Sequence, residues 1–205
     1  MKKAIKSSPG DAALKVFRAH GGVLKTTQAI NEGIQPRVLY ALRDSDVIEQ
    51  VARGLFRLKE MPPLEAPDLF RVASRIPRSV ICLISALVFH GLTTQIPREV
   101  SIALPKGAKK PKIEHPPIGI YWFSEPAFSE GIEVHRKDGV SLRVYSVEKT
   151  LADCFKFRHR IGMDVCLEAL RDWHERKRAD TRNLMYFAKI CRVHRIIRPY
   201  IEALS

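Results

Sequence analysis

The first 45 residues carry apolar side chains at a helical spacing, interrupted by turn residues. Ser8 and Pro9 are typical of an N-cap followed by the first helical position. A helix is predicted from there to about His20, with Leu14 and Phe17 facing inward, and the glycine pair at positions 21 and 22 ends it.

Two further helices are predicted before residue 45. Thr26 or Thr27 can cap the first of them, which Gly33 ends, and Gln35 with Pro36 starts the next. On a helical wheel, one face of this next helix is apolar and suited to a core, and it consists of Val38, Leu39 and Leu42. The other face offers two guanidiniums and a phenol, groups suited to base edges and phosphates, on Arg37, Arg43 and Tyr40.

A β-hairpin is predicted directly after these helices. Arg53 and Gly54 form its turn, and Leu55–Leu58 alternates as its second strand, so that Arg53 and Arg57 are expected beside the sugar-phosphate backbone. Short helix, turn, second helix and basic hairpin describe a winged helix-turn-helix, which places a helix in the major groove of DNA. The predicted DNA-binding residues are Thr27, Gln35, Arg37, Tyr40, Arg43, Arg53 and Arg57.

A proline-rich segment, residues 61–67, indicates a domain boundary. We predict a winged helix-turn-helix domain at residues 1–60, a linker and connecting helix at 61–77, and a second domain at 78–205. The connecting helix is expected at residues 68–75 and ends before Ile76 and Pro77.

The second domain is predicted to group its strands between helices, which makes the whole chain α+β. An apolar helix is expected at about residues 78–91, and Ser146 is expected to cap another whose first turn holds Glu148. The expected strands lie at residues 100–104, 118–123, 131–136 and 140–146, the last two forming a hairpin around Asp138 and Gly139, and the later helices at 163–175, 181–193 and 195–204.

The chain carries a formal net charge of +13, which favours polyanions through counterion release. Residues 1–60 hold 11 Lys/Arg against 6 Asp/Glu and residues 61–205 hold 24 against 16, so the excess is spread over both parts. A second basic surface is a candidate contact for phosphate or an acidic partner, and the alternative is an ordinary solvated face. Its residues are Lys109 and Lys110 in the loop 106–112, and Arg182, Lys189 and Arg192 on one helical stripe.

The four cysteines, Cys82, Cys154, Cys166 and Cys191, lie far apart in apolar contexts. Buried free thiols in a reducing cytoplasm are therefore expected, and neither a metal site nor a cofactor is predicted. The longest apolar run, residues 80–89, is too short to span a bilayer, so no membrane partner is expected.

A metal-dependent nuclease, targeted to DNA by the winged helix, is the alternative from a different class. Glu148, Lys149 and Asp153 are the residue types that nucleases gather around a divalent metal. However, Glu148 and Asp153 are five positions apart and fall on different faces of one helix. Ser85 with His90 lacks a nucleophile elbow, and no P-loop, GxGxxG or HExxH motif occurs.

The order of these parts resembles the AbiEi-type antitoxins of the bacterial AbiE (type IV) toxin–antitoxin systems. The residues that carry the resemblance are the winged-helix segment, the apolar stretch 80–93 and the segment 144–155. The turn after the recognition helix departs from related winged helices, which often have a glycine there. It reads Asp44-Ser45-Asp46 and so puts two carboxylates near the path of the phosphates.

The resemblance implies a repressor that binds inverted repeats upstream of its own operon and a C-terminal domain that neutralises a nucleotidyltransferase-like toxin. By position, it assigns DNA contacts to Arg37, Tyr40 and Arg43 on the helix and to Arg53 and Arg57 on the wing. A repressor without a toxin partner stays open as a further alternative.

Overall fold

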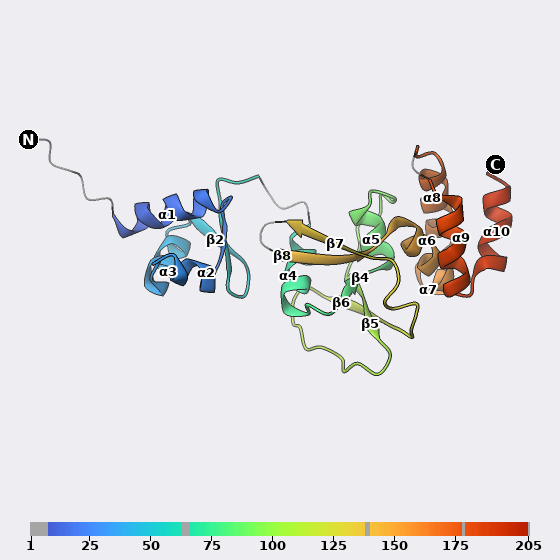
Figure 1. Ribbon diagram of the computed structural model, residues 1–205, viewed down its shortest axis with the longest axis horizontal. Coiled ribbons are helices and arrows are strands. Elements are labelled where there is room, and N and C mark those ends of the chain that lie inside the picture. The colour runs from blue at the N-terminus through green and yellow to red at the C-terminus, as the bar shows by residue number, and fades with distance from the viewer. Residues whose placement is uncertain (1–7, 63–65, 138–139, 178, 205) are drawn as a thin grey trace, which may run out of the picture. The chain divides into compact units, whose positions relative to one another are not determined.

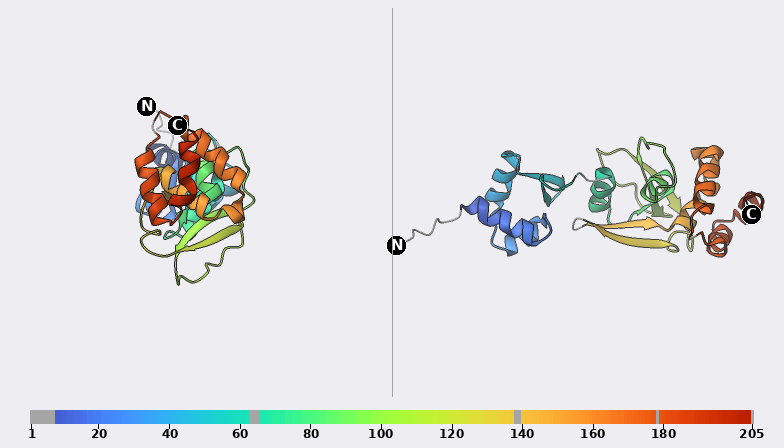
Figure 2. Two further views of the ribbon diagram at one scale, coloured as in Figure 1. Left: turned by 90° about the vertical axis from the view of Figure 1, so that its right-hand side faces the viewer. Right: turned by 90° about the horizontal axis from the view of Figure 1, so that it is seen from above.

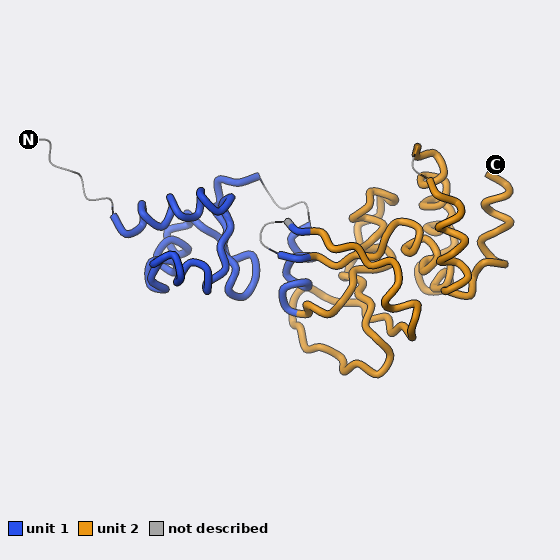
Figure 3. The backbone as a smooth tube through the Cα atoms, viewed as in Figure 1, with its two compact units in different colours: residues 1–75, 136–141 blue, residues 76–135, 142–205 orange. Residues whose placement is uncertain are grey.

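The computed structural model describes residues 8–62, 66–137, 140–177 and 179–204. The chain divides into two compact units, one of residues 1–75 with 136–141 and the other of residues 76–135 with 142–205 (Figure 3). The expected domain boundaries at residues 60 and 77 stay a prediction. Residues 63–65 of the expected linker, and Asp138 and Gly139 of the expected hairpin turn, lie outside the described residues.

The first unit packs its helices on a small sheet around a core that includes Phe17, Leu24, Leu39 and Phe56 (Figure 1). Its elements in chain order are α1 (Pro9–Ala19), β1 (Val23–Lys25), α2 (Thr26–Asn31), α3 (Pro36–Asp44), β2 (Ile48–Ala52), β3 (Leu55–Leu58) and α4 (Pro67–Arg75). The helices and the hairpin lie where the sequence predicts them, and the unit is a winged helix-turn-helix extended by α4.

The N-terminal ends of α1 and α2 are capped in different ways. The Ser8 hydroxyl accepts from the Asp11 backbone N–H at 3.1 Å, and the Asp11 carboxylate accepts from the Ser8 N–H in return, as a capping box requires. The predicted threonine cap of α2 is wrong. The N-cap residue is Lys25. Its backbone N–H donates to Gln28 Oε1 at 3.0 Å, so the side-chain amide of Gln28 supplies the hydrogen-bond acceptor at the N-terminus of α2.

The strand β1 was not expected, and it extends the β2–β3 hairpin into a three-stranded sheet. The sheet has the order β1-β3-β2, so β3 is its central strand and pairs antiparallel with both neighbours. All four residues of β3 are buried, which corrects the predicted alternation of buried and exposed positions along Leu55–Leu58.

The second unit is built on a five-stranded mixed sheet of order β6-β5-β4-β8-β7. The β4–β8 and β5–β6 pairs are parallel, and the β4–β5 pair is antiparallel. Its elements are β4 (Val80–Ile81), α5 (Leu83–Phe89), β5 (Val100–Pro105), β6 (Ile118–Phe123), β7 (Ile132–Lys137), β8 (Val140–Tyr145), α6 (Val147–Lys156), α7 (Arg158–Ile161), α8 (Met163–His174), α9 (Thr181–Ile190) and α10 (His194–Glu202).

The expected apolar helix at residues 78–91 is only partly right. Its first part is the strand β4, which lies in the middle of the sheet. The helix α5 begins only at Leu83, which itself has a φ of 47°. A buried strand and a buried helix segment are both continuously apolar, so periodicity does not separate them.

The core of the second unit lies between the sheet and the helices that follow β8. Figures 1 and 2 show α6 to α10 gathered at one end of the unit. Tyr145, Leu151, Phe155, Trp173 and Leu184 are fully or almost fully buried there. All four cysteines are free and buried, as the sequence predicts.

Candidate nucleic-acid interface

The helix α3 is held by a tight turn from α2 and by its apolar face. Gly33 has a φ of 82°, a conformation that side chains disfavour, and the next residue, Ile34, is buried and donates its N–H to the Ala29 carbonyl at 2.8 Å. Leu39 and Leu42 are buried in the core of the unit. Backbone and packing therefore set the orientation of α3.

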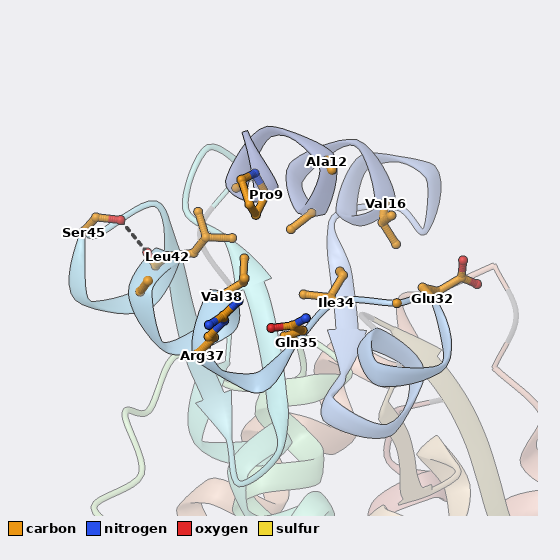
Figure 4. Close-up of a pocket in the computed structure, with 14 residues that line it drawn as sticks. Pro9, Ala12, Val16, Glu32, Ile34, Gln35, Arg37, Val38, Leu42 and Ser45 are labelled. Carbon is orange, nitrogen blue, oxygen red and sulfur yellow. Dashed lines mark hydrogen bonds between the residues drawn. The ribbon is translucent and has the colours of Figure 1, made fainter. Parts of the chain in front are cut away.

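A groove of about 770 Å³ runs between α1 and α3 (Figure 4). Val38 and Leu42 point from α3 toward α1 in this view, and Arg37 lines the groove near the start of α3. The apolar face of α3 is thus turned toward its neighbour, as the helical wheel predicts.

The polar face of α3 presents Arg37, Tyr40 and Arg43. Arg37 is exposed and forms no ion pair within the part of the chain that the structure describes, and Tyr40 is 47% exposed. The guanidinium carbon of Arg43 lies 4.9 Å from the centre of the Tyr40 ring. That ring in turn meets the ring of Phe56 edge-on, with the centroids 6.2 Å apart.

This stack connects the surface of α3 to the centre of the sheet. Phe56 is 2% exposed and belongs to the central strand β3, so it gives Tyr40 a rigid support. A guanidinium over a tyrosine face gains about 0.5–1 kcal/mol at an exposed site. Tyr40 and Arg43 are consequently preordered on the outer face of α3.

The two carboxylates at the C-terminal end of α3, on Asp44 and Asp46, are each neutralised by a neighbouring cation. Asp44 Oδ1 accepts from Arg43 Nε at 3.0 Å and from Arg43 Nη2 at 2.8 Å, and Asp46 pairs with Lys59. Asp46 has a φ of 64°, so it adopts the left-handed conformation for which related turns use glycine. These pairs reduce the repulsion between the turn and a phosphate chain.

The two wing arginines differ in their surroundings. Arg53 is exposed at the hairpin turn, next to Gly54 with its φ of 72°. The predicted solvent-facing position of Arg57 is wrong, because its residue is 3% exposed. Nη1 of Arg57 donates to Glu49 Oε1 at 3.0 Å, directly across the β2–β3 pair, and Nη2 donates to the Pro62 carbonyl.

The physical reason is the position of β3 between two strands. Arg57 is flanked by Val23 of β1 on one side and by Glu49 of β2 on the other. The Pro62 carbonyl also contacts it, so the buried guanidinium takes a carboxylate and a carbonyl as partners. Arg57 therefore stabilises the wing from inside. Of the other predicted residues, Thr27 and Gln35 are exposed beside α3, at the start of α2 and at the N-cap of α3 respectively.

Residues 11–59 match the family model of the AbiEi antitoxin transcriptional regulators. This segment is therefore similar to the AbiEi antitoxin transcriptional regulators. The match covers the helices α2 and α3 and the hairpin, and it confirms the predicted winged-helix class and a DNA-binding regulatory role. The contacts of individual AbiEi-domain residues with DNA stay predictions.

The structure is similar to the crystal structure of the RV2827C protein from Mycobacterium tuberculosis, with 12% sequence identity, a TM-score of 0.49, and coverage of 93% of this chain and 79% of that chain. No curated protein matches the chain.

Outside the AbiEi match, the candidate second basic surface falls on two separate elements. Lys109 and Lys110 are exposed in the loop between β5 and β6, whereas Arg182, Lys189 and Arg192 are exposed on and just after α9. Sequence reasoning missed two exposed aromatic side chains beside these cations, Trp122 and Tyr186, which are 47% and 49% exposed. The only sign of them in the sequence is that each occupies a position on the solvent-facing side of its strand or helix.

The residues of the nuclease alternative have separate partners. The Glu148 carboxylate accepts from Trp173 Nε1 at 3.1 Å and from Asn183 Nδ2 at 3.5 Å. Asp153 is fully buried and accepts from Lys149 Nζ at 2.5 Å and from Cys191 Sγ at 3.1 Å. Burial raises the pKa of the Asp153 carboxyl, and the Lys149 ammonium acts against that rise.

No three His, Cys, Asp or Glu side chains in the described ranges are grouped in a way that could hold a metal ion. No helix there has the length and apolar character needed to cross a bilayer.

Proposed function

We propose that this chain is a repressor that inserts α3 into the major groove of its operator. The observation that carries the proposal is the outer face of α3, which offers Arg37, Tyr40 and Arg43. Tyr40 and Arg43 are preordered, and the carboxylates at the end of the helix, Asp44 and Asp46, are both paired with cations. Residues near the N-terminus of a recognition helix reach base edges, and Arg37 is the second residue of α3. Arg37 is thus assigned to base reading.

Arg43 and Arg53 are assigned to the phosphates that flank the groove. Arg43 lies in the last turn of α3 and is held by Tyr40 and Asp44, and Arg53 lies at the tip of the wing. Contacts of this kind set the register of a protein on DNA and carry no sequence information directly. Thr27 and Gln35 are assigned supporting contacts at the near ends of α2 and α3.

The proposed operator has inverted repeats and lies upstream of the chain's own operon. A two-fold operator requires two copies of the protein, one on each half-site. This part of the proposal is supported by the match of residues 11–59 to the AbiEi antitoxin transcriptional regulators.

A mobility-shift measurement at fixed salt tests the assignment of α3. The upstream DNA fragment is titrated with the wild-type chain, with Arg37→Glu/Arg43→Glu, and with the control Lys177→Glu/Arg195→Glu. The control has the same change of charge on exposed residues of the second unit. We expect the α3 variant to lose the shift and the control to keep it. Equal loss in both variants would show that only net charge matters.

We further propose that the second unit neutralises a nucleotidyltransferase-like toxin through the exposed stripe of α9. Arg182, Tyr186 and Lys189 follow one another at helical spacing on α9. Arg192 is exposed just after the helix, where its φ of 60° takes it off the predicted helical stripe. Tyrosine and arginine are enriched at protein interfaces and are common among the residues that dominate their binding energy. A partner with an acidic face would suit this stripe.

Co-purification with the product of the neighbouring reading frame tests the neutralisation proposal. Arg182→Glu/Tyr186→Ala should release the partner, whereas Arg37→Glu/Arg43→Glu should retain it while losing DNA. Absence of a nucleotidyltransferase-like neighbour would favour a repressor without a toxin partner.

We propose a non-enzymatic role for the second unit. The separate partners of Glu148 and Asp153 support this, because a two-carboxylate metal site would need both groups to face one ion. Incubation with plasmid and Mg²⁺ or Mn²⁺ is the test, and cleavage that disappears in Glu148→Ala would instead establish the nuclease. A cytoplasmic location stays a prediction from the cysteine content.

A further inference from the structure

The loop after β5 is strongly basic and has an ordered start. Residues 106–112 contain four lysines and no acidic residue. The Lys106 N–H donates to the Phe123 carbonyl at 2.7 Å, and the Ala108 N–H donates to the Pro105 carbonyl at 3.0 Å. Figure 1 shows the β5–β6 connection extending away from the helices of its unit. The charges are therefore displayed on a defined turn.

Trp122 fixes an aromatic surface next to this turn. It lies on β6, which is an edge strand of the sheet, and its side chain is half exposed. Its indole Nε1–H donates to the Ala108 carbonyl at 3.2 Å, so the ring is tied to the basic loop by its polar edge. Part of the ring is left open to solvent beside the lysines.

The lysines of this loop have no acidic partner among the residues that the structure describes. Lys106, Lys109, Lys110 and Lys112 form no ion pair within the described part of the chain, and three of them flank the residue that binds the indole. Lysines alone could serve to keep another chain away from the edge strand. That role does not explain an exposed tryptophan, which would weaken the protection.

The combination of residue types distinguishes nucleic acid from protein as the occupant. Lysine is depleted in the cores of protein interfaces, whereas it is a common phosphate binder as a point charge. Sites for single-stranded nucleic acid combine a cationic path for the backbone with an aromatic ring on which a base stacks. Bases of an intact duplex are already stacked on each other and do not offer a free face.

We propose that Trp122 and residues 106–112 form a binding site for single-stranded nucleic acid. One unpaired base stacks on the indole, and the lysines contact the phosphates on either side. The site is independent of α3, so it goes beyond the proposed operator binding. Up to four phosphate contacts would give a slope of log affinity against log salt of about −3, since each contributes about −0.7 on single strands.

Tryptophan fluorescence can report on this site alone. The chain has two tryptophans, and the other, Trp173, is 2% exposed in the core of the second unit. The N-terminal domain has none. The full chain carrying Arg37→Glu/Arg43→Glu is titrated with oligothymidylate and, separately, oligouridylate of about 12 nucleotides, a length within the usual site sizes. The two oligomers distinguish DNA from RNA as the source of the strand.

We expect at least one oligomer to quench the emission. Trp122→Phe should remove the quenching, and Trp122→Ala should lower the affinity about fivefold or more, measured by anisotropy of a labelled oligomer. Lys109→Gln/Lys110→Gln should reduce the magnitude of the salt slope by about 1.4, and the control Lys177→Gln/Arg195→Gln should leave it unchanged.

Three results would overturn the proposal. The first is that neither oligomer changes the tryptophan emission at low salt. The second is that a duplex quenches the emission as strongly as a single strand does. The third is that polyglutamate quenches the emission and the oligomers do not. The last result would identify an acidic protein surface as the occupant. None of the three bears on operator binding, which is measured separately by the mobility shift of the upstream duplex fragment.

Discussion

The Lys149 ammonium lies 2.5 Å from Asp153 Oδ2 inside the second unit, and neither side chain is exposed to solvent. The two residues are one helical turn apart on α6. The ammonium also lies over the ring of Tyr145, 3.9 Å from its centre, and 4.9 Å from the centre of the Phe123 ring. The pair is thus enclosed by aromatic side chains and by Cys191, which donates to the second carboxylate oxygen.

Removing one member of this pair should destabilise the second unit strongly. We expect Lys149→Met to lower the free energy of unfolding by about 3–5 kcal/mol, because it leaves a buried carboxylate without its cation. The double variant Lys149→Met/Asp153→Leu should be more stable than this single variant. Urea unfolding measures both, with Lys156→Met, an exposed lysine on the same helix, as the control. A loss no larger than that of the control would contradict the account.

His90 should make the stability of the chain depend on pH. Burial lowers the pKa of its imidazole below 6.5, opposed by its hydrogen bond to the Tyr145 carbonyl at 2.7 Å and by the nearby Glu133 and Glu148. In the window between the lowered pKa and 6.5, the unfolded chain binds a proton that the folded chain does not. Stability is therefore lost as pH falls through this window.

The variant His90→Gln retains a hydrogen-bond donor but does not titrate. We expect the difference in unfolding free energy between wild type and variant to shrink as pH falls from 7.5 toward 5.5. Measuring urea midpoints of both proteins at each pH cancels the contribution of the other titratable groups. A difference that stays constant across the window would contradict the shifted pKa.

The two arginines of the wing should have different roles: Arg53 contacts DNA, and Arg57 stabilises the fold. Arg53→Ala should leave the unfolding free energy unchanged and reduce the slope of log affinity against log salt by about 0.9 in magnitude. Arg57→Met should instead lower stability, because Glu49 loses its partner inside the hairpin. Thermal unfolding and salt-dependent binding of both variants test this division. Identical behaviour of the two variants would contradict it.

Sequence reasoning predicted the elements that carry a strong local pattern. Patterns within ten residues of the chain were enough to predict the two faces of α3 and the N-caps at Ser8 and Ser146. The helix that follows Ser146 was predicted in the same way. The interior position of Arg57 could not be predicted in the same way. It depends on β1, a strand of three residues more than thirty positions earlier, whose pairing turns β3 into a central strand.

Nonlocal contacts also account for the other differences. The strand β4 has two residues, and only its pairing with β5 and β8 distinguishes it from the start of a helix. The neutralised turn at Asp46 depends on Lys59, and the position of Trp122 beside Ala108 depends on the parallel β5–β6 pair. The basic loop was recognisable from its sequence, but its aromatic neighbour was not.

The most direct test of the account is the ratio of operator affinity to nonspecific affinity in Arg37→Ala at one salt concentration. If Arg37 reads a base edge from the start of α3, the operator affinity should fall by about 1–3 kcal/mol while the affinity for unrelated duplex DNA changes little. Equal losses on both DNAs would mean that Arg37 contacts only phosphate, and no loss on either would contradict the placement of α3 in the groove.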